Sequence, residues 1–293
     1  MHILPINNKH NNIAYRGCLT TEFIPQKYQN KGISTWLIHE SSFFRDLPML
    51  EYVTSHLIQF KKPSYNIISG ACSEGFELLS MKMLAQEAGL KVDCLGFDVG
   101  ERAINKANSF NYTIAYANKQ YGTDKIDGYS DSFLMFTNPE EMTPQQKKLK
   151  DLFNKYFITY PKAIYPPTLA CYSPSTEVEL KREERNNVKF IQGNLLEMDS
   201  FVPKNSANVL FFKNAMYHLT YDEDDLPKAR GEMREILEKA VTQIDKALVS
   251  NGLFVLGNLW RDHYADVGVE TYNTLYNHNF EPVCDKSIWI KKR

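Results

Sequence analysis

A short turn between Gly70 and Gly75 carries the pattern in this sequence that points most directly to chemistry. It reads G-A-C-S-E-G and joins an apolar segment, Asn66–Ile68, to a helical pattern that starts at Glu77. A strand that enters a helix through such a turn directs free backbone N–H groups at whatever lies over the helix N-terminus. Glycine at both ends lets the backbone approach a ligand without interference from a Cβ atom. The turn therefore predicts a nucleotide-type site, with a plain structural turn as the alternative.

The middle of this turn departs from the fingerprint of dinucleotide-binding proteins. That fingerprint has a glycine where Cys72 stands, and the Cys72 side chain would crowd a pyrophosphate lying against the backbone. A nucleoside without phosphates needs no such room. The pattern favours a nucleoside ligand, and it argues against a nicotinamide dehydrogenase, which would share the fold.

A carboxylate follows at the spacing that such a site requires. The apolar segment Val92–Asp98 ends in an acid that lies 23 residues beyond Gly75. This is close to the separation, about 20 residues, at which nucleoside sites place a carboxylate on the ribose hydroxyls. The physical reason is that the tip of the second strand lies beside the first turn. Asp98 is thus a candidate for ribose binding, and a solvent-facing acid at a strand end is the alternative.

The elements that must position these residues alternate along the chain. Helical spacing marks Met49–Phe60 and a long stripe from Met233 to Leu248. Further strands are expected at Val188–Gln192, Asn208–Phe212 and Leu253–Gly257, with a terminal hairpin of Phe280–Val283 and Ser287–Ile290. We expect an α/β fold with a doubly wound, Rossmann-like, mostly parallel sheet, helices on both faces and ligands at the carboxyl ends of the strands.

A long insertion interrupts this alternation between residues 113 and 187. A connection of this length in a compact domain is usually a functional segment or a small subdomain. Its aromatic residues include Tyr156, Phe157, Tyr160, Tyr165 and Tyr172. Chain order suggests that the insertion leaves and re-enters the sheet at the ligand edge, where it would form a wall for a second substrate; aromatic packing on the domain is the alternative. We expect an N-terminal arm and helical segment at 1–60 and the main domain at 61–293.

Composition excludes several classes of protein. Lys and Arg number 34 against 35 Asp and Glu among 293 residues, so the net charge of −1 predicts no nucleic-acid partner and no anionic membrane partner. The 5 cysteines are widely spaced, which is typical of reduced residues and predicts no metal site. With no signal-type segment at the start of the chain and no run long enough to span a membrane, we expect a cytoplasmic protein. The sequence does not predict an oligomeric state.

Several of these segments, taken in order, resemble the CheR-type methyltransferases, which use S-adenosylmethionine to methylate glutamates of chemotaxis receptors. In chain order, that family's motifs are T-x-F-F-R, A-C-S-x-G-E-E, a strand-end aspartate, A-L-x-x-A-x-x-G-x-Y, an asparagine-leucine pair, R-N-V and L-x-P-G-G-x-L-x-L-G. The corresponding segments here are Ser41–Arg45, Ala71–Glu77, Asp98, Ala103–Tyr112, Asn194–Leu195, Lys213–Ala215 and Leu248–Gly257. The resemblance implies a class I methyltransferase sheet.

The resemblance also implies a set of residues that bind S-adenosylmethionine. They are Ser41, Arg45, Gly70, Ala71, Glu77, Asp98, Asn194, Leu195, Asn214 and Ala215. Arg45 would bind the carboxylate of the cofactor as a fork, and Glu77 would pair with its ammonium group. Asn194 would offer an amide to the adenine edge, and Asn214 lies where the methyl group would emerge.

The implied reaction is O-methylation of a carboxylate, on a protein glutamate or a small acid. Such an acceptor has a pKa of about 4, so it is ionised at neutral pH and needs no general base. The catalytic candidates are Asn214 and His218; His218 would serve as a base for a hydroxyl or amine acceptor, while a structural role is the more usual one for a lone histidine. A small-molecule O- or N-methyltransferase and a catalytically inactive cofactor-binding module remain alternatives.

Overall fold

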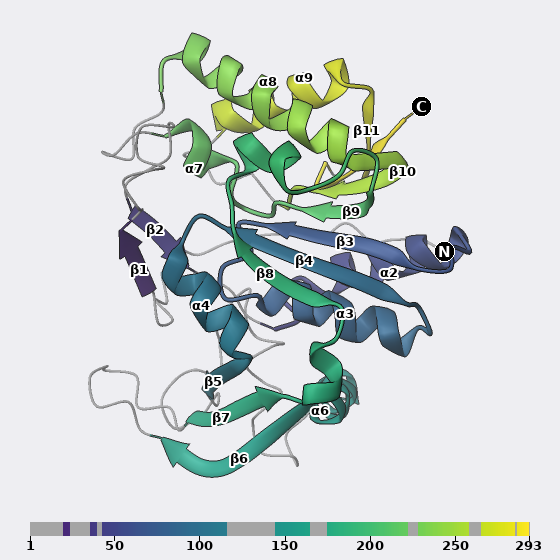
Figure 1. The fold of residues 1–293 in the computed structure, drawn as a ribbon. Helices are drawn as coiled ribbons and strands as arrows, with labels where there is room; N and C mark the ends of the chain where they lie inside the picture. Colours follow the sequence, from purple (N-terminus) through teal and green to yellow (C-terminus); the bar gives the residue numbers. More distant parts are fainter. Residues whose placement is uncertain are drawn as a thin grey trace.

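A seven-stranded sheet forms the centre of the computed structural model (Figure 1). The structure describes residues 20–23, 36–39, 43–115, 144–164, 175–221, 228–257, 265–284 and 286–292. In spatial order the strands are β11 (Phe280–Cys284), β12 (Ile288–Lys291), β10 (Leu248–Val255), β9 (Ala207–Phe211), β3 (Tyr65–Gly70), β4 (Val92–Asp98) and β8 (Val188–Gln192). Two further strands, β1 (Thr20–Phe23) and β2 (Trp36–His39), pair with each other in an antiparallel ribbon.

The direction of the strands confirms the expected fold. Strands β10, β9, β3, β4 and β8 are mutually parallel. Strand β12 pairs antiparallel with both β10 and β11, so the C-terminal hairpin closes one edge of the sheet. The expected doubly wound, Rossmann-like sheet is therefore present, with its antiparallel hairpin.

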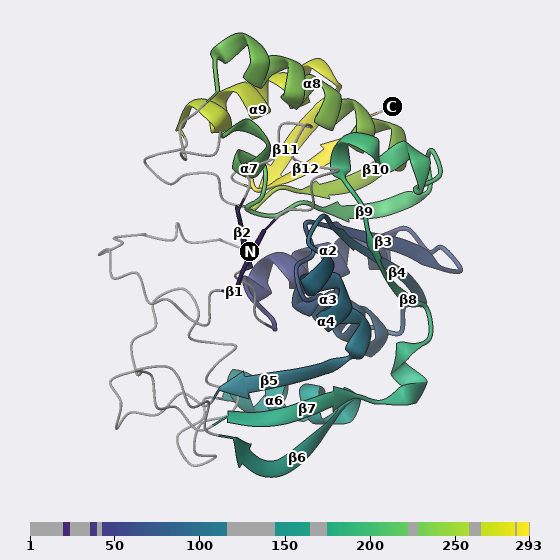
Figure 2. The same ribbon diagram turned by 60° about the vertical axis from the view of Figure 1, so that its left-hand side comes forward.

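Helices cover both faces of the sheet, as Figures 1 and 2 show. One layer contains α2 (Leu47–Gln59), α3 (Phe76–Glu87) and α4 (Glu101–Ser109); the other contains α8 (Arg230–Ala247) and α9 (Ala265–Asn277). Each layer buries an apolar stripe against the sheet, and all five residues of β9 are buried between the two layers. This is the burial expected of a central parallel strand. No helix among the described residues is both long enough and apolar enough to span a membrane.

The insertion contains a small antiparallel sheet of its own. Its strands lie in the order β5 (Asn111–Ala115), β7 (Ser175–Leu180) and β6 (Phe157–Ile164), and α6 (Pro144–Tyr156) leads directly into β6. In Figure 2 this sheet lies beyond the α2, α3 and α4 layer, on the side away from α8 and α9. The described part of the insertion is thus a small subdomain rather than a structureless loop.

The insertion is attached at the amino ends of the parallel strands, whereas chain order suggested their carboxyl ends. Helix α4 starts after the carboxyl end of β4 and runs back along the sheet before β5 begins. Strand β8 runs parallel to β4, so the insertion re-enters at the amino ends of the strands. The expectation that it leaves and re-enters at the ligand edge is wrong, because it overlooked the return path of α4.

Aromatic side chains of the insertion pack into the main core. The rings of Phe153 and Phe157 each lie 5.1 Å from the ring of Phe43, centroid to centroid, and both are buried. Phe43 also contacts Phe76 on α3 and Tyr112 on β5. Among the expected wall residues, Phe157 and Tyr156 are therefore part of the core, Tyr160 is exposed, and Tyr165 and Tyr172 lie outside the described residues.

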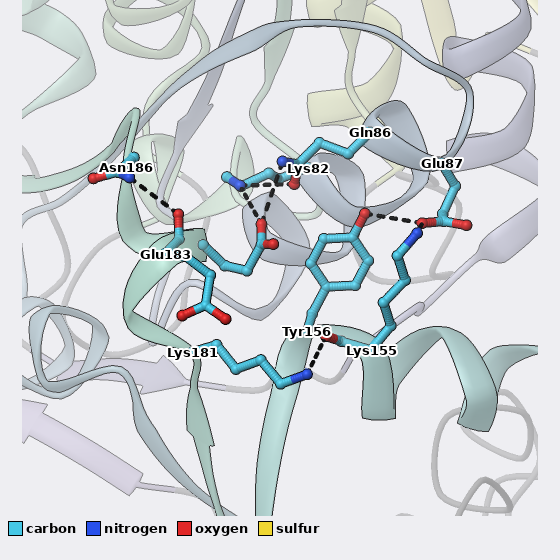
Figure 3. Close-up of polar contacts among 9 residues, drawn as sticks. Lys82, Gln86, Glu87, Lys155, Tyr156, Lys181, Glu183 and Asn186 are labelled. Carbon is cyan, nitrogen blue, oxygen red and sulfur yellow. Dashed lines mark hydrogen bonds and ion pairs between the residues drawn. The ribbon is translucent and has the colours of Figure 1, made fainter.

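Polar contacts also fasten the insertion to α3 (Figure 3). The Tyr156 hydroxyl donates to Glu87 Oε1 at 3.0 Å, and Lys155 forms an ion pair with the same carboxylate. The Lys82 ammonium, which is buried, binds Glu184 Oε2 at 3.3 Å, within the short helix η5 (Arg182–Arg185) that leads into β8. These contacts lie toward the C-terminal half of α3, away from the Gly70–Gly75 turn.

Candidate functional site

The predicted site residues gather at the carboxyl ends of four neighbouring strands. Gly70 ends β3 and Ala71 follows it, Asp98 ends β4, Asn194 and Leu195 follow β8, and Asn214 and Ala215 follow β9. Glu77 lies in the first turn of α3, and Arg45 precedes α2. Ser41 lies outside the described residues. This edge is where open α/β sheets bind their ligands.

Asp98 holds two of the loops at this edge together. Its carboxylate accepts the backbone N–H of Ser73 at 2.8 Å and that of Gly100 at 2.9 Å, and its side chain is buried. These two bonds tie the turn after β3 and the start of α4 to the end of β4. Asp98 therefore has a structural role in addition to the predicted ribose contact.

The turn after β3 has a backbone that few sequences adopt. Ala71 and Ser73 both have left-handed φ angles, of 49° and 51°. Non-glycine residues in this region store strain, and such strain gathers at ligand sites. The Cys72 side chain points inward, and burial raises its thiol pKa well above the usual range, with the charges of Asp98 and Glu77 adding to the effect. Cys72 is accordingly a neutral packing residue.

Gly70 has a different explanation from the one inferred from the sequence. A Cβ atom at this position would lie 2.5 Å from the ring of Phe97 and 2.9 Å from the ring of Phe212. The close approach that requires glycine here is made by two aromatic rings of the core. The argument that Gly70 leaves space for a ligand finds no support in this packing.

Glu77 has a partner within the protein. Its Oε2 atom lies 2.9 Å from the Lys213 ammonium, and the Ser69 hydroxyl donates to its Oε1 atom at 3.4 Å. The same ammonium lies 3.1 Å from Asp46 Oδ2. Lys213 is the residue that replaces the arginine of the R-N-V motif, and its side chain is 5% exposed. The sequence alone gave it no role.

Asn194 caps the short helix η6 (Leu195–Ser200). Its Oδ1 atom accepts the backbone N–H of Leu196 at 3.0 Å. Its Nδ2 group is buried and has no hydrogen-bond partner among the described residues. The orientation is fixed by the cap, because only Oδ1 can accept from an N–H group. A donor is therefore left facing the interior beside Leu195, which is also buried.

The loop after β9 contains the two catalytic candidates. Asn214 has a left-handed φ of 56°, and its Oδ1 atom is buried without a hydrogen-bond partner among the described residues. Ala215 is buried beside it. His218 lies in the single-turn helix α7 (Tyr217–Thr220), and its ring is 4.0 Å from that of Tyr217. The two candidates thus occupy one loop at the same edge of the sheet.

Unsatisfied buried polar atoms mark this edge. In the part of the chain that the structure describes, four buried side-chain atoms lack a hydrogen bond: Ser73 Oγ, Asn194 Nδ2, Asn214 Oδ1 and Thr271 Oγ1. The first three follow β3, β8 and β9 at the carboxyl edge. An unsatisfied buried donor or acceptor costs about 1–3 kcal/mol, so each of these atoms calls for a partner, which a ligand or an ordered water would provide.

Sequence reasoning missed three residues that shape the site. They are Ser73, Asp46 and Lys213, of which only Lys213 had a visible signal, as a charged residue that follows the expected strand Asn208–Phe212. A fourth, Gly257, makes room for the loop after β9. Its φ is +75°, and a Cβ atom there would lie 2.3 Å from Lys213 Cγ and 2.7 Å from Asn214 Oδ1.

Comparisons with known proteins give distant structural matches. Neither a protein-family model nor a curated protein matches the chain. Among solved structures, a TehB-like S-adenosylmethionine-dependent methyltransferase from Corynebacterium glutamicum is 10% identical with a TM-score of 0.35, over 82% of this chain and 87% of that one. DszA carbon methyltransferase is 10% identical with a TM-score of 0.42, over 84% and 54%.

A third match is the bifunctional kinase-methyltransferase WbdD. It is 9% identical with a TM-score of 0.44, over 85% of this chain and 39% of that one. At these identities and TM-scores the likeness says nothing of the reaction. The assignment of the chain to the Rossmann-like α/β class rests on its own strand order and strand directions.

Proposed function

We propose that the chain is an S-adenosylmethionine-dependent methyltransferase that acts on a carboxylate acceptor, in the manner of the CheR family. The observation that carries this proposal is the set of three unsatisfied buried polar atoms at the carboxyl edge, on Ser73, Asn194 and Asn214. They flank the buried carboxylate of Asp98. Together they supply hydrogen-bond donors and acceptors for an uncharged nucleoside, which is the part of S-adenosylmethionine that carries no phosphate.

Each part of the cofactor has residues that fit it. The Asn194 Nδ2 donor suits an acceptor nitrogen of adenine, and Asp98 suits the ribose hydroxyls. Arg45 and Glu77, at the β9 side of the edge, suit the carboxylate and the ammonium of the amino-acid tail. The order of the strands, β9, β3, β4 and β8, matches the order of the parts of the cofactor, from the amino-acid tail through the ribose to the adenine.

The main role of the protein in this reaction would be to position the two reactants. S-adenosylmethionine supplies a sulfonium methyl group, and the acceptor oxygen forms a bond to that carbon as the bond from carbon to sulfur breaks. The chain would position the acceptor in line and exclude water. A carboxylate needs no base, whereas His218 is available in the same loop as Asn214 if the acceptor is a hydroxyl or an amine.

Two measurements test the proposal. In calorimetry we expect binding of S-adenosylhomocysteine and none of NAD; heat from NAD alone would refute the proposed cofactor. Incubation with methyl-labelled S-adenosylmethionine and host lysate then identifies the acceptor. Label in protein that is released by mild base indicates a methyl ester, as we propose. Base-stable label in a small molecule would favour the small-molecule alternative, and binding without any transfer would favour an inactive module.

A further inference from the structure

The Lys213 side chain joins three segments that are far apart in the sequence. Its ammonium contacts Glu77 Oε2 at 2.9 Å, Asp46 Oδ2 at 3.1 Å and the Arg45 carbonyl oxygen at 3.5 Å. A lysine ammonium has three donors, and these three acceptors use all of them. Lys213 is therefore saturated by protein groups and leaves no donor for a ligand.

The consequence is that Lys213 acts through its neighbours. It holds the Oε2 atom of Glu77, while Oε1 has, among the described residues, only the long contact with the Ser69 hydroxyl. It also fixes the backbone at Arg45, in a turn where Phe44 and Asp46 have left-handed φ angles of 56° and 55°. Glu77 and Arg45 are thus tied to a single buried cation at the end of β9.

In the part of the chain that the structure describes, the ion pairs of Lys213 and of its partner Asp46 form a balanced set of charges. Arg45 and Lys213 carry two positive charges, and Asp46 and Glu77 carry two negative charges. A ligand group with one net charge would upset this balance in a partly buried place, whereas a zwitterion would not. The α-amino and α-carboxylate groups of an amino acid have this property.

We propose that Lys213 is a positioning residue that presents Glu77 and Arg45 as one recognition unit for the zwitterionic amino-acid tail of the ligand. The inference rests on the proposed function, because it assigns the tail of S-adenosylmethionine to this end of the site. It adds a residue that the ligand does not touch, and it explains why a lysine with a buried side chain stands two residues after the central strand β9.

The test compares two ligands that differ in the tail. S-adenosylhomocysteine carries the amino-acid tail, and methylthioadenosine keeps the nucleoside and the sulfur but lacks it. By calorimetry, we expect the unaltered protein to bind S-adenosylhomocysteine more tightly by at least about tenfold. We expect Lys213→Met to remove most of that advantage while it changes methylthioadenosine affinity by less than about twofold. Lys213→Arg, which keeps the charge and the donors, should restore the advantage.

Lys82→Met is the matched control. Lys82 lies on the same helix as Glu77, its side chain is 4% exposed, and it also forms an ion pair, with Glu184. We expect this variant to lose stability without altering the ratio of the two affinities. A Lys213→Met variant that weakens both ligands equally, or neither, would overturn the inference.

Comparison of the two ligands on the unaltered protein keeps the inference testable even if Lys213→Met fails to fold. Equal affinities would show that the tail is not recognised, which overturns the inference and leaves the proposed cofactor intact. Binding of neither ligand would instead refute the proposed function, and the inference with it.

Discussion

The carboxylate of Asp98 accepts the backbone N–H of Ser73 at 2.8 Å, so the acid that ends β4 also holds the turn that follows β3. A second bond, to the N–H of Gly100, ties in the start of α4. One side chain therefore sets the relative position of two loops that together form the centre of the candidate site. Substitutions of Asp98 must affect the fold of the site as well as any ligand contact.

Asp98→Asn is expected to lower both stability and ligand affinity. An asparagine amide has one acceptor oxygen and would turn an NH₂ group toward one of the two backbone donors, leaving it unsatisfied. We expect a loss of about 1–3 kcal/mol in the free energy of unfolding, measured with denaturant, and weaker binding of S-adenosylhomocysteine. Asp93→Asn, at an exposed position of the same strand, is the control. Equal stability of the two variants would remove the structural role from Asp98.

Asn194 allows stability and binding to be separated. Asn194→Asp keeps the oxygen that accepts the N–H of Leu196 but replaces the Nδ2 donor, which has no partner in the described part of the chain. Asn194→Ala removes both. We expect both variants to bind S-adenosylhomocysteine more weakly, and only the alanine variant to lose the stability of the cap, about 1 kcal/mol. If Asn194→Asp binds as well as the unaltered protein, the Nδ2 group does not contact the ligand.

Gly257→Ala should disturb the loop after β9. The new methyl group would meet Lys213 and Asn214 at distances that force both to move, and the positive φ of this residue adds strain. We expect a loss of about 1–3 kcal/mol in the free energy of unfolding and reduced ligand affinity. Gly231→Ala is the control, because a Cβ atom there meets nothing within 4 Å and alanine favours the α8 helix. A neutral Gly257→Ala would contradict this packing.

Glu87 links the stability of the insertion to pH. The hydrogen bond from Lys155, together with that from Tyr156, lowers the pKa of the Glu87 carboxyl below its usual 4.5. A carboxyl whose pKa is lower in the folded state stabilises the fold at pH values above its pKa in the unfolded state. This stabilisation is lost as the pH falls through the pKa of the folded state. Because the Glu87 side chain is 39% exposed, we expect its ion pair to contribute only about 0.2–1 kcal/mol to the free energy of unfolding.

Glu87→Gln should therefore have a lower melting temperature than the unaltered protein at pH 7. Near pH 3 the difference between the two melting temperatures should be smaller. Glu183→Gln removes the same charge from an exposed residue that contributes its backbone carbonyl to the contacts in Figure 3. That control should leave the pH dependence of the melting temperature unchanged. A constant difference between Glu87→Gln and the unaltered protein across this range would contradict the linkage.

The parallel strands were predictable because they are short apolar runs between clear breaks. Strands β4 and β8 begin and end at the residues predicted. The buried stripe of α8 was visible for the same reason, whereas α9 was not predicted. Its inner face carries Glu270, Thr271 and Thr274, all buried, so its hydrophobic period is hidden. Two exposed arginines of α8 compensate the Glu270 charge, a pairing that spacing along the chain does not reveal.

The residues of the candidate site were easier to predict than their contacts. The strand-end positions of Asp98, Asn194 and Asn214 follow from the alternation of strands and helices. The saturation of Lys213 and the rings that fill the space beside Gly70 depend on side chains from other elements. The insertion was misplaced because its path depends on the direction of α4, and local patterns carry no information on direction.

The attachment of the insertion has a consequence for how the protein unfolds. Its first and last strands are adjacent, with the Leu180 N–H bonded to the Phe110 carbonyl at 2.9 Å, so the excursion closes on itself. An insertion whose two ends lie side by side can ordinarily unfold independently of the main domain. Phe153 and Phe157, however, complete the apolar cluster around Phe43. The small sheet and the large one consequently share a core, and they should unfold in a single cooperative transition.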